Sequence, residues 1–273
     1  MQISLFPSST LGSDSSRLSQ VRSGALEFEV TSGAIVSAFL PPAALSGVAF
    51  AFGDYPAVWR AMDGELGAYI RWAIETVGLH PFARVWGNGF RQITSTARPI
   101  NEPRDLTGMK IRVPKSQLWA DMFTALGAAP APLNFAAVYA GLRDKAIDGQ
   151  ENPLAVVEAS RLFEVQKYCA ITNHAWDGLW VLCSQSLWNR LSRPLQEIIE
   201  RNLDTAGLDQ REEVARLNKA LPRLLEARGM IVNTPAMEPF RRKLRGAGFY
   251  DTWHETYGDK AWSLLARYAD GLA

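Results

Sequence analysis

Short apolar runs typical of β-strands alternate with longer segments of helical periodicity along this chain of 273 residues. Three of these runs are especially clear: MKIRVP at 109–114, GLWVLC at 178–183 and MIVNTP at 230–235. The segment SQLWADMFTALG at 116–127 repeats its apolar residues at intervals of three and four, which predicts an amphipathic helix. Strands that alternate with helices predict an α/β protein with largely parallel sheets.

The length of the chain suits two moderate domains better than one large one. The glycine-rich GNG at 87–89 and the segment HAWD at 174–177 are the places where we expect the chain to cross between them. A long periodic segment at 194–228 predicts a late helix, interrupted or kinked at Pro222. The expected lobes are 1–88 plus 178–217, and 89–177 plus 218–273. Two lobes joined by several crossings imply a cleft.

Composition and charge exclude several classes of protein. With 47% hydrophobic residues the chain can bury a sizeable core, and it has no apolar stretch long enough for a transmembrane helix. Its 29 basic and 28 acidic residues give a net charge of +1 without any run of like charges, which argues against a nucleic-acid or membrane-surface partner.

The N-terminal segment MQISLFPSSTLG alternates apolar residues at its start, as in a half-buried strand. It has neither a positively charged region nor an apolar core, so we expect that a secretory signal is not encoded in this chain. Such a signal was either removed, or the start is incomplete.

No residues have the spacing of a metal site or a known catalytic motif. Cys169 and Cys183 each lie in an apolar run, which predicts two buried thiols, with a disulfide as the alternative. His80, His174 and His254 are far apart in sequence, and no C-x-x-C pair accompanies them. We also find no nucleophile elbow, zinc-protease motif or phosphate loop. The sequence therefore predicts no cofactor, no metal and no catalytic residue.

The stretch AIDGQENPL at 146–154 concentrates hydrogen-bonding groups between two helical patterns. Asp148 and Gly149 suit a turn, and Asn152 followed by Pro153 suits a helix N-cap. These roles leave Gln150 and Glu151 unexplained. The two residues lie beside a predicted helix N-terminus, which favours an anion. An outward-pointing Asn152 amide could donate to a bound carboxylate, although a simple cap is the alternative.

Two arginines in strand-like runs are candidates for anion recognition. Arg112 lies between Ile111 and Val113, so its guanidinium would point alone across the sheet. A planar fork of donors on a strand suits bidentate capture of a carboxylate. Arg91, in FRQITS, has the same character. For each, an internal salt bridge or an exposed edge is the alternative.

Several of these blocks together resemble a known family. DLTGMKIRVP, LGAAPAPLNFAAVYAGLRDKAIDGQENPL and FEVQKYCAITNH look like signature blocks of the substrate-binding proteins of TRAP transporters, the DctP family. The opening ISLFPSSTLG and the run WGNGFRQITSTARPI are similar to that family too. The resemblance implies a two-domain fold like that of periplasmic binding proteins, with a ligand cleft between the lobes. Family members begin with a further strand and helix before the block ISLFPSS.

The resemblance also implies roles for single residues. Arg112 would form the principal salt bridge to a ligand carboxylate, with Arg91 as a second arginine that faces the ligand. Asn152 would be the amide donor, and Phe135 an aromatic residue of the pocket wall. Two further residues are expected to face the ligand: Trp176, near a proposed crossing, and Ser32, where some sialic-acid-binding relatives carry an acidic residue.

Family members are periplasmic, close around an organic acid and deliver it to a membrane permease, and we expect this chain to do the same as a monomer. An α/β enzyme that uses Arg112 to bind its substrate is the competing hypothesis, although the missing catalytic motifs count against it. A third is a fragment or a sensor domain that never meets a permease. Which organic acid is bound does not follow from the sequence.

Overall fold

The computed structural model describes residues 3–7, 9–269 and 272. Its helices are α1 (Asp14–Ser23), α2 (Gly33–Val36), α3 (Tyr55–Met62), α4 (Glu65–Glu75), α5 (Gln117–Ala125), α6 (Val138–Arg143), α7 (Leu154–Ala159), α8 (Gln185–Trp188), α9 (Arg193–Ala227), α10 (Glu238–Gly246) and α11 (Phe249–Ala266). Its 3-10 turns are η1 (Pro41–Gly47), η2 (Pro103–Leu106), η3 (Phe135–Ala137) and η4 (Leu162–Glu164). Its strands are β1 (Phe28–Ser32), β2 (Leu79–Pro81), β3 (Trp86–Ser95), β4 (Lys110–Val113), β5 (Ala129–Pro132), β6 (Gly149–Pro153), β7 (Tyr168–Ala170), β8 (Trp176–Ser184) and β9 (Ile231–Asn233).

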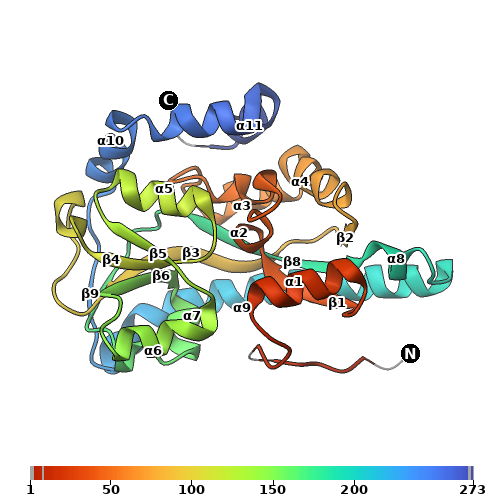
Figure 1. Ribbon diagram of the computed structural model, residues 1–273, viewed down its shortest axis with the longest axis horizontal. Helices are drawn as coiled ribbons and strands as arrows, with labels where there is room; N and C mark the ends of the chain where they lie inside the picture. The colour runs from red at the N-terminus through yellow and green to blue at the C-terminus, as the bar shows by residue number, and fades with distance from the viewer. Residues whose placement is uncertain (1–2, 8, 270–271, 273) are drawn as a thin grey trace.

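The strands form a central mixed sheet with helices on both sides (Figure 1). Its main path runs β1-β8-β3-β6-β4-β5, with β2 beside β8, β7 beside β3 and β9 beside β7. The pairs of β4 with β5 and β6, and of β7 with β9, are parallel, whereas β3 and β8 pair antiparallel to their neighbours. The α/β class is therefore confirmed, and the sheet is mixed rather than largely parallel.

Strands β3 and β8 join the two halves of the sheet. The first half of β3, at 86–90, pairs with β8, while its second half, at 91–95, pairs with β6 and β7. The GNG segment at 87–89 lies within the continuous strand β3, where the pairing register with β8 shifts between Gly87 and Gly89. A strand shared by both halves is how a two-lobed chain crosses its cleft. The lobe boundaries given above stay a prediction.

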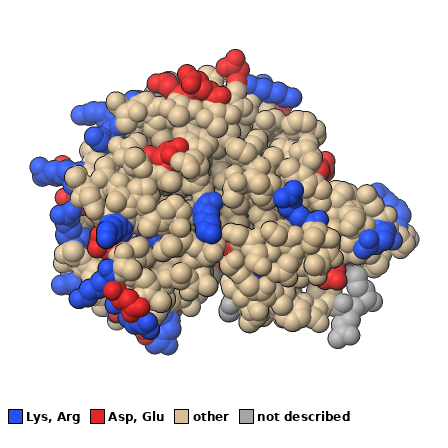
Figure 2. All heavy atoms as spheres, in the orientation of Figure 1, with Lys and Arg blue, Asp and Glu red and all other residues tan. Residues whose placement is uncertain are grey.

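Two late helices connect distant parts of the molecule. The long helix predicted from the sequence is α9, which passes Pro222 within the helix and packs against β3, α7 and β9. Helix α11 lies over the opposite side, where it packs against η1, α4 and α5 (Figure 1). None of the helices in the described part combines the length and apolarity that a bilayer crossing requires. On the face drawn in Figure 2, basic and acidic side chains lie scattered and do not gather into one patch.

The stretch AIDGQENPL has a different local structure from the one predicted. Residues Gly149–Pro153 form strand β6, which is buried along its whole length between β3 and β4. The following helix α7 has Pro153 at its N-cap position, so Asn152 is a strand residue and not a cap. Pairing on both sides overrides the turn and cap propensities of this segment. Its polar side chains consequently lie inside the sheet.

The strand predicted at the N-terminus is not present among the described residues of that segment. Ile3 and Leu5 lie in irregular chain, with 59% and 86% of their surface exposed. A half-buried strand requires a pairing partner, and no strand of the described part pairs with residues 3–7. The alternating pattern alone therefore gave a wrong local prediction there.

Gly149 at the start of β6 has no space for a side chain. A Cβ atom there would lie 2.1 Å from Met109 Cε and 2.3 Å from the carbonyl oxygen of Thr94. We expect Gly149→Ala to lower the free energy of unfolding by about 1–3 kcal/mol, because backbone must shift to admit the methyl group. Gly246→Ala is the control, since nothing lies within 4 Å of its Cβ position. Urea denaturation of both variants measures this, and equal stability of the two would contradict the packing described.

Candidate ligand-binding site

A cavity of about 960 Å³ opens beside the crossing strands. One part of its lining is apolar and comes from residues 3–7, β1, α8 and the first turns of α9. The other part is polar and comes from β3, β4, β6 and β8. The structure brings five of the six predicted ligand-binding residues to this cavity, namely Ser32, Arg91, Arg112, Phe135 and Asn152.

Arg112 on β4 presents a free guanidinium edge to the cavity. Its side chain is buried, and its Nε and Nη2 atoms donate to the carbonyl oxygen of Leu133 at 3.0 and 2.6 Å. No carboxylate among the described residues forms an ion pair with it, so its Nη1–Nη2 end keeps unused donors. Burial lowers the pKa of Arg112 to about 10, although the negative charge of Glu151 acts to raise it. With this pKa, Arg112 is protonated at neutral pH. The ring of Phe135 lies beside the guanidinium, 5.8 Å from Cζ to its centroid.

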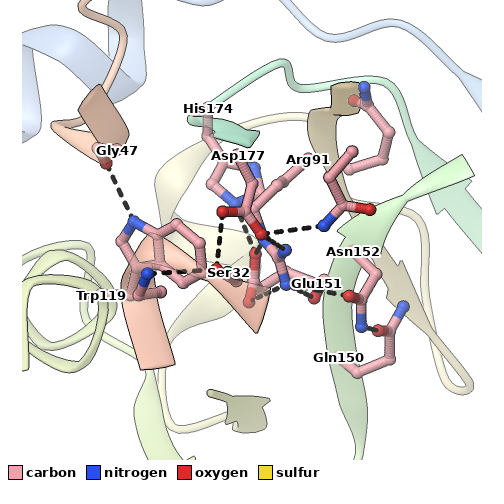
Figure 3. A network of polar contacts seen from close by, with 12 residues as sticks. Ser32, Gly47, Arg91, Trp119, Gln150, Glu151, Asn152, His174 and Asp177 are labelled. Atoms are coloured by element: carbon pink, nitrogen blue, oxygen red, sulfur yellow. Dashed lines mark hydrogen bonds and ion pairs between the residues drawn. The ribbon is translucent and has the colours of Figure 1, made fainter. Parts of the chain in front are cut away.

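Arg91 on β3 is held by a buried network of acceptors (Figure 3). Its Nε donates to Glu151 Oε2, and its Nη2 donates to Glu151 Oε1 at 2.9 Å and to Asn152 Oδ1 at 3.0 Å. Its Nη1 donates to Asp177 Oδ2 at 2.9 Å. Burial disfavours the charged guanidinium, but the two carboxylates outweigh it and raise the pKa of Arg91. Arg91 therefore matches the internal-salt-bridge alternative, although it also reaches the cavity wall.

Two aromatic side chains complete this network. The indole of Trp119 lies 4.4 Å from Arg91 Cζ and donates through Nε1 to the carbonyl oxygen of Gly47 at 2.9 Å. His174 is buried, with Nε2 3.2 Å from Glu151 Oε2 and Nδ1 2.7 Å from the Thr172 hydroxyl. Burial lowers the pKa of His174, so its neutral ring donates from Nε2 and accepts at Nδ1. This bond helps to fix the Glu151 carboxylate.

Hydrogen bonds within and between elements position further residues around the cavity. Asn152 donates from Nδ2 to Gln150 Oε1 and keeps a second N–H. Ser32 donates to Asp177 Oδ1 at 2.7 Å and accepts from the Ala34 N–H. Across the cavity, Asp14 Oδ2 at the start of α1 accepts from the Phe135 N–H at 3.1 Å. Elements far apart in sequence therefore meet at one site.

Trp176 is the predicted site residue that the structure places elsewhere. It does not line the cavity, because its indole is buried edge-on against Phe52 and Trp59. The adjacent Asp177 lines the cavity instead, together with Asn88, which donates to Asp177 Oδ2 at 2.9 Å. Sequence analysis missed both. An acidic residue inside an otherwise apolar strand was the available signal, because a buried carboxylate needs partners.

The potential metal ligands and the two thiols lie as follows in the described part of the chain. It contains no cluster of three or more histidine, cysteine, aspartate or glutamate side chains that could hold a metal ion. Cys169 and Cys183 are both buried free thiols, and burial raises the pKa of each to about 12. The disulfide alternative is therefore not realised in this structure.

Comparison with known proteins identifies the family of this chain. The model of the bacterial extracellular solute-binding protein family 7, DctP, matches residues 1–247. This chain belongs to the DctP family. A relative from Escherichia coli K12, the 2,3-diketo-L-gulonate-binding periplasmic protein, is 35% identical over 79% of this chain. The chain spans 65% of the length of that relative.

Solved structures of DctP-type proteins have the same fold. A TRAP periplasmic solute-binding protein from Roseobacter denitrificans with bound β-D-glucuronate is 30% identical, with a TM-score of 0.89 over 94% of this chain and 85% of its own. A second, from Polaromonas sp. JS666 bound to D-erythronate, is 27% identical, with a TM-score of 0.91 over 96% of this chain and 86% of its own. These proteins are binding receptors, which counts against the enzyme hypothesis.

The Arg91 network predicts a large cost for removing one charge. Glu151→Gln keeps the shape but leaves the buried guanidinium with Asp177 alone, so we expect the free energy of unfolding at pH 7 to fall by about 3–5 kcal/mol. Glu197→Gln on exposed α9 breaks a surface pair with Arg193 and should cost less than about 1 kcal/mol. Chemical denaturation of the two variants decides the question, and similar losses would count against the network.

The same carboxylate predicts a pH dependence. Burial alone would raise the pKa of Glu151, but Arg91 and His174 outweigh it and hold the pKa below the ordinary value of 4.5. Its stabilising effect is therefore complete above about pH 4.5 and is lost as pH falls through the lower folded pKa. The stability difference between wild type and Glu151→Gln should narrow below pH 4.5. A constant difference across that range would show that Glu151 is not the group responsible.

Proposed function

We propose that this chain is the solute-binding protein of a TRAP-type transporter, which binds a small organic acid by its carboxylate and delivers it to a membrane permease. The observation that carries the proposal is the free Nη1–Nη2 edge of Arg112, a buried guanidinium that lines the cavity without a carboxylate partner among the described residues. Leaving such a charge without an anion is costly, and the fork geometry suits a carboxylate. The Leu133 carbonyl holds the other edge and fixes its direction.

The relatives support the chemical class of the ligand. The proteins from Escherichia coli, Roseobacter and Polaromonas are described with diketo-gulonate, glucuronate and erythronate, all of which are carboxylic acids. The family and these relatives also support a periplasmic location for the mature protein. We further propose that the chain works as a monomer. We also propose that it has no nucleic-acid partner, because a net charge of +1 gives no excess of basic side chains for phosphate contacts.

Arg112→Lys tests recognition by the guanidinium fork. Lysine keeps the charge but replaces two parallel donors with one flexible ammonium, so a charge-assisted hydrogen bond worth roughly 1.5–3 kcal/mol is lost. We expect the dissociation constant for an organic acid to rise by roughly one to two decades. Calorimetric titration measures it, with the acid that gives the largest thermal shift in a screen.

The matched control is Arg143→Lys, the same substitution at an exposed arginine that pairs with Asp144 at the end of α6. It should leave the affinity unchanged. Wild-type affinity in Arg112→Lys would mean that the carboxylate is held elsewhere, and Arg91 would be tested next.

Lobe closure around the acid is the second part of the proposal. The Asp14 side chain reaches the Phe135 N–H across the cavity, and β3 and β8 are the crossings about which such closure would occur. We expect saturating acid to lower the radius of gyration in small-angle scattering. Arg112→Lys at the same acid concentration is the control and should show little change. An unchanged radius in saturated wild type would refute the hinge.

A further inference from the structure

Only one of the guanidinium groups that line the cavity is free for an anion. Arg17 pairs with Asp14 and Glu29 at 3.0 and 2.9 Å, and Arg91 is held between Glu151 and Asp177. Arg112 is the one that donates only to a backbone carbonyl within the described part of the chain. The site therefore has one strong position for a carboxylate.

Apart from Arg112, the charged residues of the lining have a negative balance. Its carboxylates are Asp14, Glu27, Glu29 and Asp177, against the guanidinium groups of Arg17, Arg91 and Arg112. Glu151 lies directly behind Arg91 and adds one more negative charge. A second carboxylate on the same ligand would meet like charge after the first had taken Arg112, which costs binding energy.

Asp177 offers an acceptor for a different kind of group. In the described part of the chain its three hydrogen-bond partners are donors, namely Ser32 Oγ at 2.7 Å, Asn88 Nδ2 at 2.9 Å and Arg91 Nη1 at 2.9 Å. Burial raises the pKa of Asp177, but Arg91 and the two other donors oppose this shift, and the carboxylate acts as an acceptor in every one of these bonds. A carboxylate has about four lone-pair positions, so about one remains free. Asn88 Oδ1 has no hydrogen-bond partner in the described part of the chain, and Asn88 is half-buried at the cavity wall. Both free acceptors suit hydroxyl donors.

The strand order separates the two groups by three strand spacings, which leaves room for a chain of several carbons. Arg112 lies on β4 and Asp177 on β8, with β3 and β6 between them in the sheet. Three inter-strand spacings place these strands about 14 Å apart, part of which the arginine side chain spans.

We propose that Asp177 and Asn88 are specificity-determining residues that accept hydroxyl hydrogens, so that the protein selects polyhydroxy monocarboxylic acids over dicarboxylic acids and unsubstituted fatty acids. The inference rests on the proposed carboxylate-binding function and names its substrate class. Arg112 takes the carboxylate. The acceptors at β3 and β8 take the hydroxyl groups and repel a second carboxylate.

Two sets of acids matched in carbon number test the proposal by calorimetric titration. The six-carbon set is galactonate, gluconate, hexanoate and adipate, and the four-carbon set is erythronate, butanoate and succinate. Within at least one set, we expect a hydroxylated acid to bind about 10- to 100-fold more tightly than its unsubstituted and dicarboxylic counterparts, because hydrogen bonds to charged groups are lost without the hydroxyls. A dicarboxylate or fatty acid as the tightest ligand overturns the inference and leaves the proposed function standing. No binding by any acid of the two sets or of the thermal-shift screen overturns both.

Asp177→Asn separates recognition from a structural role. It removes one negative charge, so the hydroxylated acid should bind about tenfold more weakly or worse while the dicarboxylate of the same length binds as well or better. Asp63→Asn is the matched control, because Asp63 pairs with Arg211 at 2.8 Å away from the cavity. It should leave the ratio of the two affinities unchanged. An unchanged ratio in Asp177→Asn would overturn the inference.

Asn88→Leu provides a second variant in case Asp177→Asn does not fold. Asn88 is half-buried, and its one hydrogen bond is the one to Asp177, so its loss is easier to tolerate. The hydroxylated acid should again weaken about tenfold, with little change for the unsubstituted acid, which has no hydroxyl to lose. Equal weakening of both acids would assign Asn88 a structural role and overturn its part in specificity.

Discussion

The buried charge of Arg91 is the constraint on which the surrounding structure depends. A guanidinium at 1% exposure is tolerated only when its donors meet charged or carbonyl acceptors in good geometry. Glu151 from β6 and Asp177 from β8 provide them, so β3 is held to both of its neighbours at the point where its pairing changes. The junction between the two halves of the sheet is consequently held by charge as well as by backbone hydrogen bonds.

The charges around Arg91 also explain why Arg112 is available to a ligand. Glu151 and Asp177 together carry one negative charge more than Arg91 can balance, and His174 stays neutral because it is buried. Glu151 favours the protonated form of Arg112, while Arg91 opposes it. Arg112 is thus stabilised at a distance without being neutralised by contact. A direct ion pair at Arg112 would have left no guanidinium edge for a carboxylate.

The sequence predicted the class of fold and indicated Arg112 as a candidate for anion binding, but it did not predict the network around Arg91. Arg112 could be identified because a charged side chain between Ile111 and Val113 in a strand must point away from these apolar neighbours. The role of Arg91 could not, since its carboxylate partners Glu151 and Asp177 lie 60 and 86 residues away. The stretch AIDGQENPL was assigned to a turn and a cap because its local propensities favour them, whereas burial between β3 and β4 makes it a strand. Long-range pairing thus decided what local pattern could not.

The position of Arg112 has a consequence for binding strength. Much of the cost of removing its charge from water is met when the protein folds, and it is visible in the lowering of its pKa to about 10 by burial. A ligand carboxylate then meets a guanidinium that is already dehydrated and already held by Leu133, so little further ordering is needed on the protein side. An added negative charge favours the protonated arginine, so binding should raise this pKa again. An anion at Arg112 would thereby offset part of the cost of burying this charge.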